Sequence, residues 1–197
     1  MFRAVLPLFL VPVATLSAPA LKDKEAYYYP TTVGAKWVYE CRVQDVDFEE
    51  ASEVTRVERE DGRLLVTVGN KRTGNDPAEV VEVSNKGLVW QQVGQAGSNY
   101  PRLPILKLPA KAGNAWEQEP GGPTRSITHY TIAAEADEVE VPAGKFVAVR
   151  VDTTQSPGKD GAIISYWYAR GVGVVKWART DIGSIHFGVL KSFEPGK

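Results

Sequence analysis

Apolar and polar residues alternate along most of the chain from Lys36 onward, and Gly, Pro, Asn or Asp interrupts the alternation about every eight to twelve residues. A period of two places alternate side chains on opposite faces of a strand, so the pattern predicts many short antiparallel strands. We expect an all-β fold: a curved antiparallel sheet, half-barrel or barrel-like, of about ten or more short strands with little helix. The predicted strands are 36–43, 52–59, 63–69, 78–84, 88–94, 115–119, 126–134, 146–153, 162–169, 172–180 and 184–192.

Turn residues mark several hairpins between these strands. The D-G pair at 61–62 and the N-K-G segment at 85–87 each separate two predicted strands, as hairpin turns do. A short helix within 45–52 is the alternative there, with weak support from its E-E-A sequence. Apolar and aromatic residues fill both faces of 162–169, so we expect that strand to be covered on both sides or to line a cavity.

One sequence pattern, P-x-x-x-G-x-x-W-x-x-E, occurs once in each half of the chain. Pro fixes an extended backbone, Gly permits the turn into a strand, and Trp is the first large residue that reaches the core. We therefore expect Trp37 and Trp116 to be buried at the start of a strand. The repeated pattern favours a pseudo-repeat of two halves, 30–108 and 109–197, and chance similarity is the alternative.

Residues 1–20 have the features of a secretory signal peptide. One cation, Arg3, precedes an uncharged apolar stretch that ends in the small pair Ala18-x-Ala20. We expect cleavage after Ala20, which leaves a single β domain, 21–197, in the periplasm or outside the cell with no transmembrane span. A retained membrane anchor is the alternative.

Composition narrows the function classes further. The chain of 197 residues carries a net charge of −1, without the basic excess of nucleic-acid-binding proteins, so we expect no nucleic-acid partner.

The chain's single cysteine, Cys41, excludes an intramolecular disulfide and multi-Cys metal sites. Because Cys41 lies well beyond the apolar N-terminal run, we expect no lipid anchor. It shares a predicted strand face with Trp37 and Tyr39, so we expect a buried, unreactive thiol.

Candidate catalytic and metal-binding residues are few. His129 and His186 alternate with inward-facing neighbours, which predicts that both face solvent. Ser184, His186 and Asp181 would make a triad on paper, but no G-x-S-x-G nucleophile turn accompanies them. The acidic segment 45–50 lacks the Gly and the Glu spacing of a calcium loop, so a solvated turn is the better interpretation. The sequence thus predicts no catalytic residue, no metal site and no cofactor.

Aromatic residues are the remaining candidates for function. Most rings at strand positions belong to a hydrophobic core, and this is the simpler interpretation here. Rings on the concave face of a curved sheet would also suit a lipid or another apolar ligand. The candidate ligand-binding residues are Trp90, Tyr166, Tyr168 and Trp177.

Three ordered patterns carry a family resemblance. They are Y-P-x-x-x-G-x-x-W-x-Y at 29–39, V-P-A-G-K-F at 141–146 and Y-W-Y-A-x-G-V-G-V-V-K at 166–176. In this order they resemble uncharacterised secreted bacterial β-rich proteins and, more distantly, the envelope lipoprotein-carrier type of fold, a half-barrel over an apolar hollow. The resemblance implies an exported sheet with room for a lipid, and it assigns no particular ligand.

Three functions stay open at this point. The first is an exported, non-catalytic protein that binds a lipid or another apolar small molecule. The second is a structural or interaction module with a filled interior that contacts another envelope protein, and the third, least favoured, is a secreted hydrolase. An unfilled apolar pocket on the concave face would favour the first, and a polar cleft with two carboxylates the third.

Overall fold

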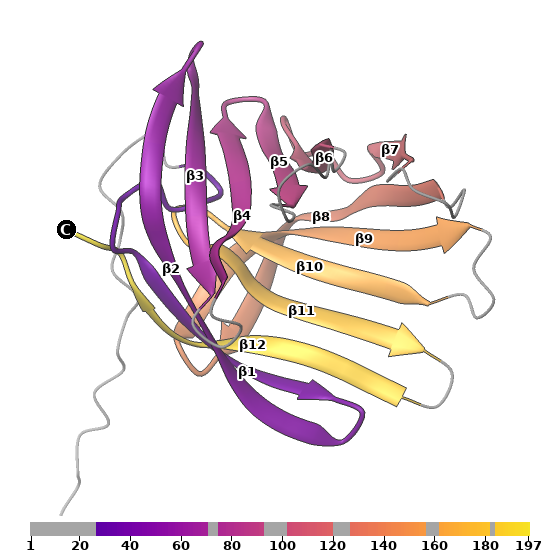
Figure 1. Ribbon diagram of the computed structural model, residues 1–197. Coiled ribbons are helices and arrows are strands. Elements are labelled where there is room, and N and C mark those ends of the chain that lie inside the picture. Colours follow the sequence, from indigo (N-terminus) through magenta and orange to yellow (C-terminus); the bar gives the residue numbers. More distant parts are fainter. Residues whose placement is uncertain (1–26, 71–74, 93–101, 120–126, 157–161, 182–183) are drawn as a thin grey trace, which may run out of the picture.

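The computed structural model describes residues 27–70, 75–92, 102–119, 127–156, 162–181 and 184–197 (Figure 1). The predicted signal peptide, 1–20, lies outside these residues. The described chain forms twelve strands, and it contains no helix with the length and hydropathy to cross a bilayer. The strands are β1 (Lys36–Val43), β2 (Val46–Glu60), β3 (Arg63–Asn70), β4 (Asn75–Ser84), β5 (Gly87–Gln92), β6 (Arg102–Lys107), β7 (Ala115–Gln118), β8 (Ile127–Val141), β9 (Gly144–Ser156), β10 (Ile163–Ala169), β11 (Gly173–Asp181) and β12 (Ser184–Glu194).

All the strands belong to one antiparallel sheet in the order β6-β5-β4-β3-β2-β1-β12-β11-β10-β9-β8-β7. Each half of the chain is a meander, and the two meanders join where β1 pairs with β12. The sheet curls strongly, which brings its edge strands β6 and β7 to the same side of the molecule (Figure 1). The all-β, barrel-like antiparallel sheet predicted from the alternation is confirmed.

The two edges of the sheet meet through side chains, at a seam formed by Pro104, Lys107 and Trp116. The Trp116 indole N–H of β7 donates to the Pro104 carbonyl of β6 at 2.8 Å. The Lys107 ammonium lies 5.4 Å from the centre of the Trp116 ring. These contacts hold the edges together without a β-ladder between β6 and β7.

The edge strand β6 and the segment 45–52 differ in kind from the sequence prediction. β6 lies outside the predicted strands because Pro104 interrupts the strand pattern, but an edge strand tolerates proline. The helix considered within 45–52 is wrong. Gln44 and Asp45, with φ values of 49° and 63°, form the turn of the β1–β2 hairpin, and β2 then runs through the segment. The acidic residues thus lie in a turn and a strand, where Asp47 accepts both hydrogen bonds from the Arg42 guanidinium.

The segments that lead into β1 and β7 make equivalent backbone hydrogen bonds, each with its own partner strand. Gly34 N–H donates to the Val54 carbonyl and Gly113 N–H donates to the Ile132 carbonyl, both at 2.9 Å. In each case the partner's own N–H returns a bond of 2.8 Å to the residue after the glycine. The register then shifts after Val54 in β2 and after Ile132 in β8, and such bulges let these two strands, each 15 residues long, follow the curl of the sheet.

Trp37 and Trp116 are both buried, as predicted, with 3% and 8% of their surface exposed. The Trp37 indole N–H donates to the Val172 carbonyl at 2.6 Å. Its ring packs against Tyr29 and Phe193, with centroid distances of 5.7 and 6.1 Å. Trp37 therefore joins β1 to the turn between β10 and β11, as Trp116 joins the two edges of the sheet.

The segment before β1 packs on the turn between β10 and β11. Gly171 N–H donates to the Tyr27 carbonyl at 2.6 Å, and the Arg170 guanidinium lies 4.4 Å from the Tyr28 ring centre. Tyr28 and Tyr29 are buried. The segment thereby covers this end of the inner face of the sheet.

Buried aliphatic side chains from both meanders, among them Val54 and Val66 from the first and Val151 and Val175 from the second, belong to one core cluster. Cys41 is 3% exposed, which confirms its predicted burial. The low reactivity of its thiol stays a prediction.

Candidate functional site

The curled sheet forms a partly open cavity of about 740 Å³ to which both meanders contribute. This volume lies within the range of roughly 300–1,000 Å³ that is typical of small-molecule sites. Aromatic residues form much of the lining: Tyr29, Trp37, Tyr39, Trp90, Tyr130, Tyr166 and Tyr168. Aliphatic residues add Val68, Val81, Leu103, Ile105, Ala162, Ile164 and Val174, and the polar lining residues are Ser52, Glu79, Thr128, Thr153, Gln155 and Arg179.

Strand pairing explains why these residues share one face. Directly opposite residues of antiparallel strands point to the same side of a sheet. One such row crosses four strands of the second meander, from Tyr130 through Thr153 and Ile164 to Arg179, and all four residues line the cavity. The period-two pattern of the sequence is thus the direct cause of the aromatic lining.

Three of the four predicted site residues come together in this cavity. Trp90, Tyr166 and Tyr168 line it, and the rings of Tyr166 and Tyr168 lie 6.3 Å apart. Trp177 is not among its lining residues. Trp177 is paired with Tyr166 and points to the same side of the sheet. Its indole packs directly on Gly188: a Cβ atom added to that glycine would lie 2.2 Å from Trp177 Nε1. Ligand binding by any of the four stays a prediction.

Glu79 also lines the cavity, and it is not among the residues predicted from the sequence. Its carboxylate accepts a hydrogen bond from the Tyr29 hydroxyl at 3.3 Å and one from the Trp90 indole N–H at 2.5 Å. A signal for its position exists in the sequence, because Glu79 has the same strand phase as the buried Val81 and Val83.

The surroundings of Glu79 disfavour its charged form. Burial raises the pKa of the Glu79 carboxyl above its ordinary value, and the hydrogen bonds from Trp90 and Tyr29 oppose that rise in part. The nearby carboxylate of Glu50 raises the pKa further. Burial also raises the pKa values of the Tyr29, Tyr39 and Tyr168 hydroxyls, so these groups stay neutral around Glu79 at ordinary pH.

The buried carboxyl of Glu79 should make stability depend on pH. Between its ordinary pKa of 4.5 and the raised folded value, the folded protein holds a proton that the unfolded chain has released. The free energy of unfolding therefore falls as the pH rises through this window. Glu79→Gln should become more stable relative to the wild type from about pH 4 to pH 8, as measured by urea denaturation. Exchange of the exposed Glu138 for Gln is the control, and parallel profiles for Glu79→Gln and the wild type would contradict the expectation.

The two histidines occupy different environments. His129 Nδ1 lies 3.0 Å from a Glu117 carboxylate oxygen, and its side chain is 37% exposed, as the prediction of a solvent-facing residue requires. The same prediction for His186 is wrong, because its Nε2 is buried and has no hydrogen-bond partner among the described residues. His186 is paired with Arg179 and so lies on the inner side of the sheet. The side chains of Ser184 and Asp181, which would complete a catalytic triad with His186, lie outside the described part of the chain.

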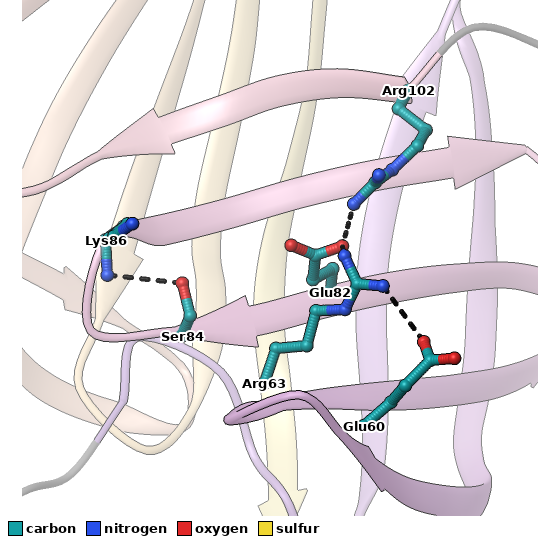
Figure 2. A network of polar contacts seen from close by, with 6 residues as sticks. All are labelled: Glu60, Arg63, Glu82, Ser84, Lys86 and Arg102. Carbon is teal, nitrogen blue, oxygen red and sulfur yellow. Dashed lines mark hydrogen bonds and ion pairs between the residues drawn. The ribbon is translucent and has the colours of Figure 1, made fainter.

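Charged groups on the outer face of the first meander compensate one another. Glu82 of β4 pairs with the Arg63 guanidinium at 3.2 Å and also with Arg102, while Arg63 reaches Glu60 at 3.0 Å (Figure 2). The adjoining hollow measures only about 150 Å³. Across the described residues, no cluster of three or more His, Cys, Asp or Glu side chains could hold a metal ion.

The fold and its internal cavity define a class of all-β, barrel-like proteins. No family model matches the sequence, and no curated protein matches it. Among solved structures, an inferred exported protein with a YmcC-like fold from Bacteroides fragilis is similar, with a TM-score of 0.54 and 13% identity over 86% of this chain and 99% of that one. An inferred lipoprotein from Parabacteroides distasonis has a TM-score of 0.45 and 14% identity over the same shares. The first likeness shows a shared YmcC-like fold.

Proposed function

We propose that the protein is an exported, non-catalytic binding protein that holds an apolar ligand inside its curled sheet. The observation that carries this proposal is the cavity of about 740 Å³ with its aromatic and aliphatic lining. Apolar pockets of this size with a few polar groups are typical of ligand sites. The cavity also argues against the alternative of a module whose interior is filled by its own side chains.

The polar groups of the cavity favour binding over hydrolysis. A glycoside hydrolase of the common type needs two carboxylates on either side of the scissile bond. Glu79 is the one carboxylate among the described residues that line this cavity. Its tyrosine and tryptophan partners hold it in place, and they supply neither a second acid nor a base.

Export is supported by the signal-peptide features of 1–20, and the similar protein from Bacteroides fragilis is itself described as an inferred exported protein. The chain's one cysteine, Cys41, lies buried in β1, which makes it unsuitable for the attachment of a lipid. We therefore propose a protein without a lipid anchor in the periplasm or outside the cell.

An environment-sensitive apolar dye should bind the purified protein saturably, and lipid should displace it. Tyr166→Ala should weaken dye binding by roughly tenfold, because it removes a ring from the lining. Trp167→Ala is the matched control on the same strand, since the Trp167 indole donates to Asp137 and is not part of the lining. Fluorescence titration measures both. A folded protein that binds neither dye nor lipid would favour the filled, interaction-type module instead.

A further inference from the structure

We infer that the ligand of this cavity is an amphiphile with a cationic amine head, and that the amine pairs with Glu79 while the apolar tail occupies the aromatic lining. The inference rests on the proposed function and adds the chemical class of the ligand. Three features carry it: the hydrogen bonding of Glu79, the character of the surrounding rings, and the sign of the neighbouring charges.

The first feature is a carboxylate with acceptor capacity to spare. A bound cation would favour the ionised form of Glu79 against the effect of burial, and an ionised carboxylate has room for about four hydrogen bonds. Among the described residues, the donors to Glu79 are two, the Tyr29 hydroxyl and the Trp90 indole N–H, and both are neutral. Burial of a carboxylate is costly unless a charge or further donors compensate it. The site is therefore suited to a donor that carries positive charge.

A comparison within β4 makes the point clearer. Glu82 lies three residues further along the same strand, on the outer face, where two guanidinium groups accompany it (Figure 2). Glu79 on the inner face has a tyrosine and a tryptophan in their place. The protein thus supplies cations to the outer carboxylate and leaves room for a ligand to supply one to the inner carboxylate.

The second feature is the concentration of aromatic rings around Glu79. Trp90 and Tyr29 contact it, and the cavity also contains Trp37, Tyr39 and Tyr168. The faces of aromatic rings carry negative electrostatic potential and attract ammonium groups, most strongly where water is displaced. A carboxylate beside several such rings is a suitable environment for an alkylammonium ion.

The third feature is the sign of the charge near Glu79. Glu50 acts on both Glu79 and Tyr39 and adds negative potential to this part of the cavity. A ligand carboxylate would be repelled here. Arg179 also lines the cavity, but it acts on Tyr166 and is largely exposed. Among the described lining residues, Arg179 is the cation with which an anionic ligand could pair, and the experiment separates the two arrangements.

The test compares three ligands with the same eight-carbon tail: octylamine, 1-octanol and octanoate, at pH 7 and at concentrations where each is dissolved as single molecules. Displacement of the bound dye gives the affinities. The wild type should bind octylamine about tenfold or more tightly than 1-octanol, and octanoate most weakly. Glu79→Gln should remove the preference for octylamine and leave 1-octanol binding within about twofold. Glu82→Gln, on the outer face of the same strand, should keep the preference.

Dye binding by Glu79→Gln itself shows whether the cavity is intact. If that variant fails to fold, the order of the three affinities in the wild type decides the inference by itself. Equal affinities for the three ligands in the wild type, or a preference for octanoate, would overturn it while the binding function stands. If neither the dye nor any of the three ligands binds, the proposed function itself fails.

Discussion

Replacing Trp37 with alanine should lower the free energy of unfolding by roughly 3–5 kcal/mol, the usual cost of removing a large buried ring. Trp37 is 3% exposed and packs on Tyr29 and Phe193. The substitution also removes the hydrogen bond to the Val172 carbonyl and leaves that buried acceptor unpaired. Urea denaturation followed by fluorescence measures the loss.

Two variants control for the separate contributions at this position. Trp37→Phe keeps an aromatic ring but loses the indole donor, so it should cost less than the alanine variant. Trp116→Ala removes the corresponding ring of the second meander, which is 8% exposed, and should cost a similar 3–5 kcal/mol. A loss below about 1 kcal/mol at position 37 would show that the ring contributes no more than a surface residue does.

Gly87→Ala should cost roughly 3 kcal/mol or more, because two penalties coincide there. The backbone φ of Gly87 is +127°, a conformation that residues with a side chain rarely adopt. A Cβ atom at this position would lie 1.9 Å from the Leu106 carbonyl oxygen. Since that neighbour is backbone, relief requires β6 to move away from β5.

Gly62→Ala is the matched control for this glycine. Gly62 also has a positive φ, +78°, but a Cβ atom there would have no heavy atom within 4 Å. Gly62→Ala should therefore lower the free energy of unfolding by about 1 kcal/mol, the cost of a positive φ for a residue with a side chain. Thermal and urea denaturation of both variants measure the difference, and equal losses would contradict a specific clash between position 87 and β6.

The sequence predicts the strands well where alternation is clear and less well where the sheet bends. β1 has the predicted bounds, 36–43, because both of its faces follow a period of two. β2 and β8 are much longer than predicted. Each contains a bulge. One extra residue in a strand moves the apolar positions to the other phase of the alternation, so the strand seems to end there in the sequence.

The candidate site is predictable only in part. Alternation places Tyr166 and Tyr168 on one face, but an aromatic face reads the same in sequence whether it fills a core or lines a cavity. That difference depends on the radius of the curled sheet, which long-range pairing sets. Glu79 and Glu82 likewise differ in strand phase alone, and their contrasting partners come from other strands.

The pairing of β1 with β12 places the first and the last strand of the chain side by side in the middle of the sheet. Lys36 is opposite Glu194, so the contacts that join the two meanders have almost the largest sequence separation that the described chain allows. Such a high contact order makes folding slow, because a long loop must close before these contacts form. A chain that lacks β12 leaves one edge of β1 and one edge of β11 unpaired, which is a template for aggregation. Completion of this fold therefore has to wait for the C-terminal strand, and until then the first meander has no partner at the β1 edge.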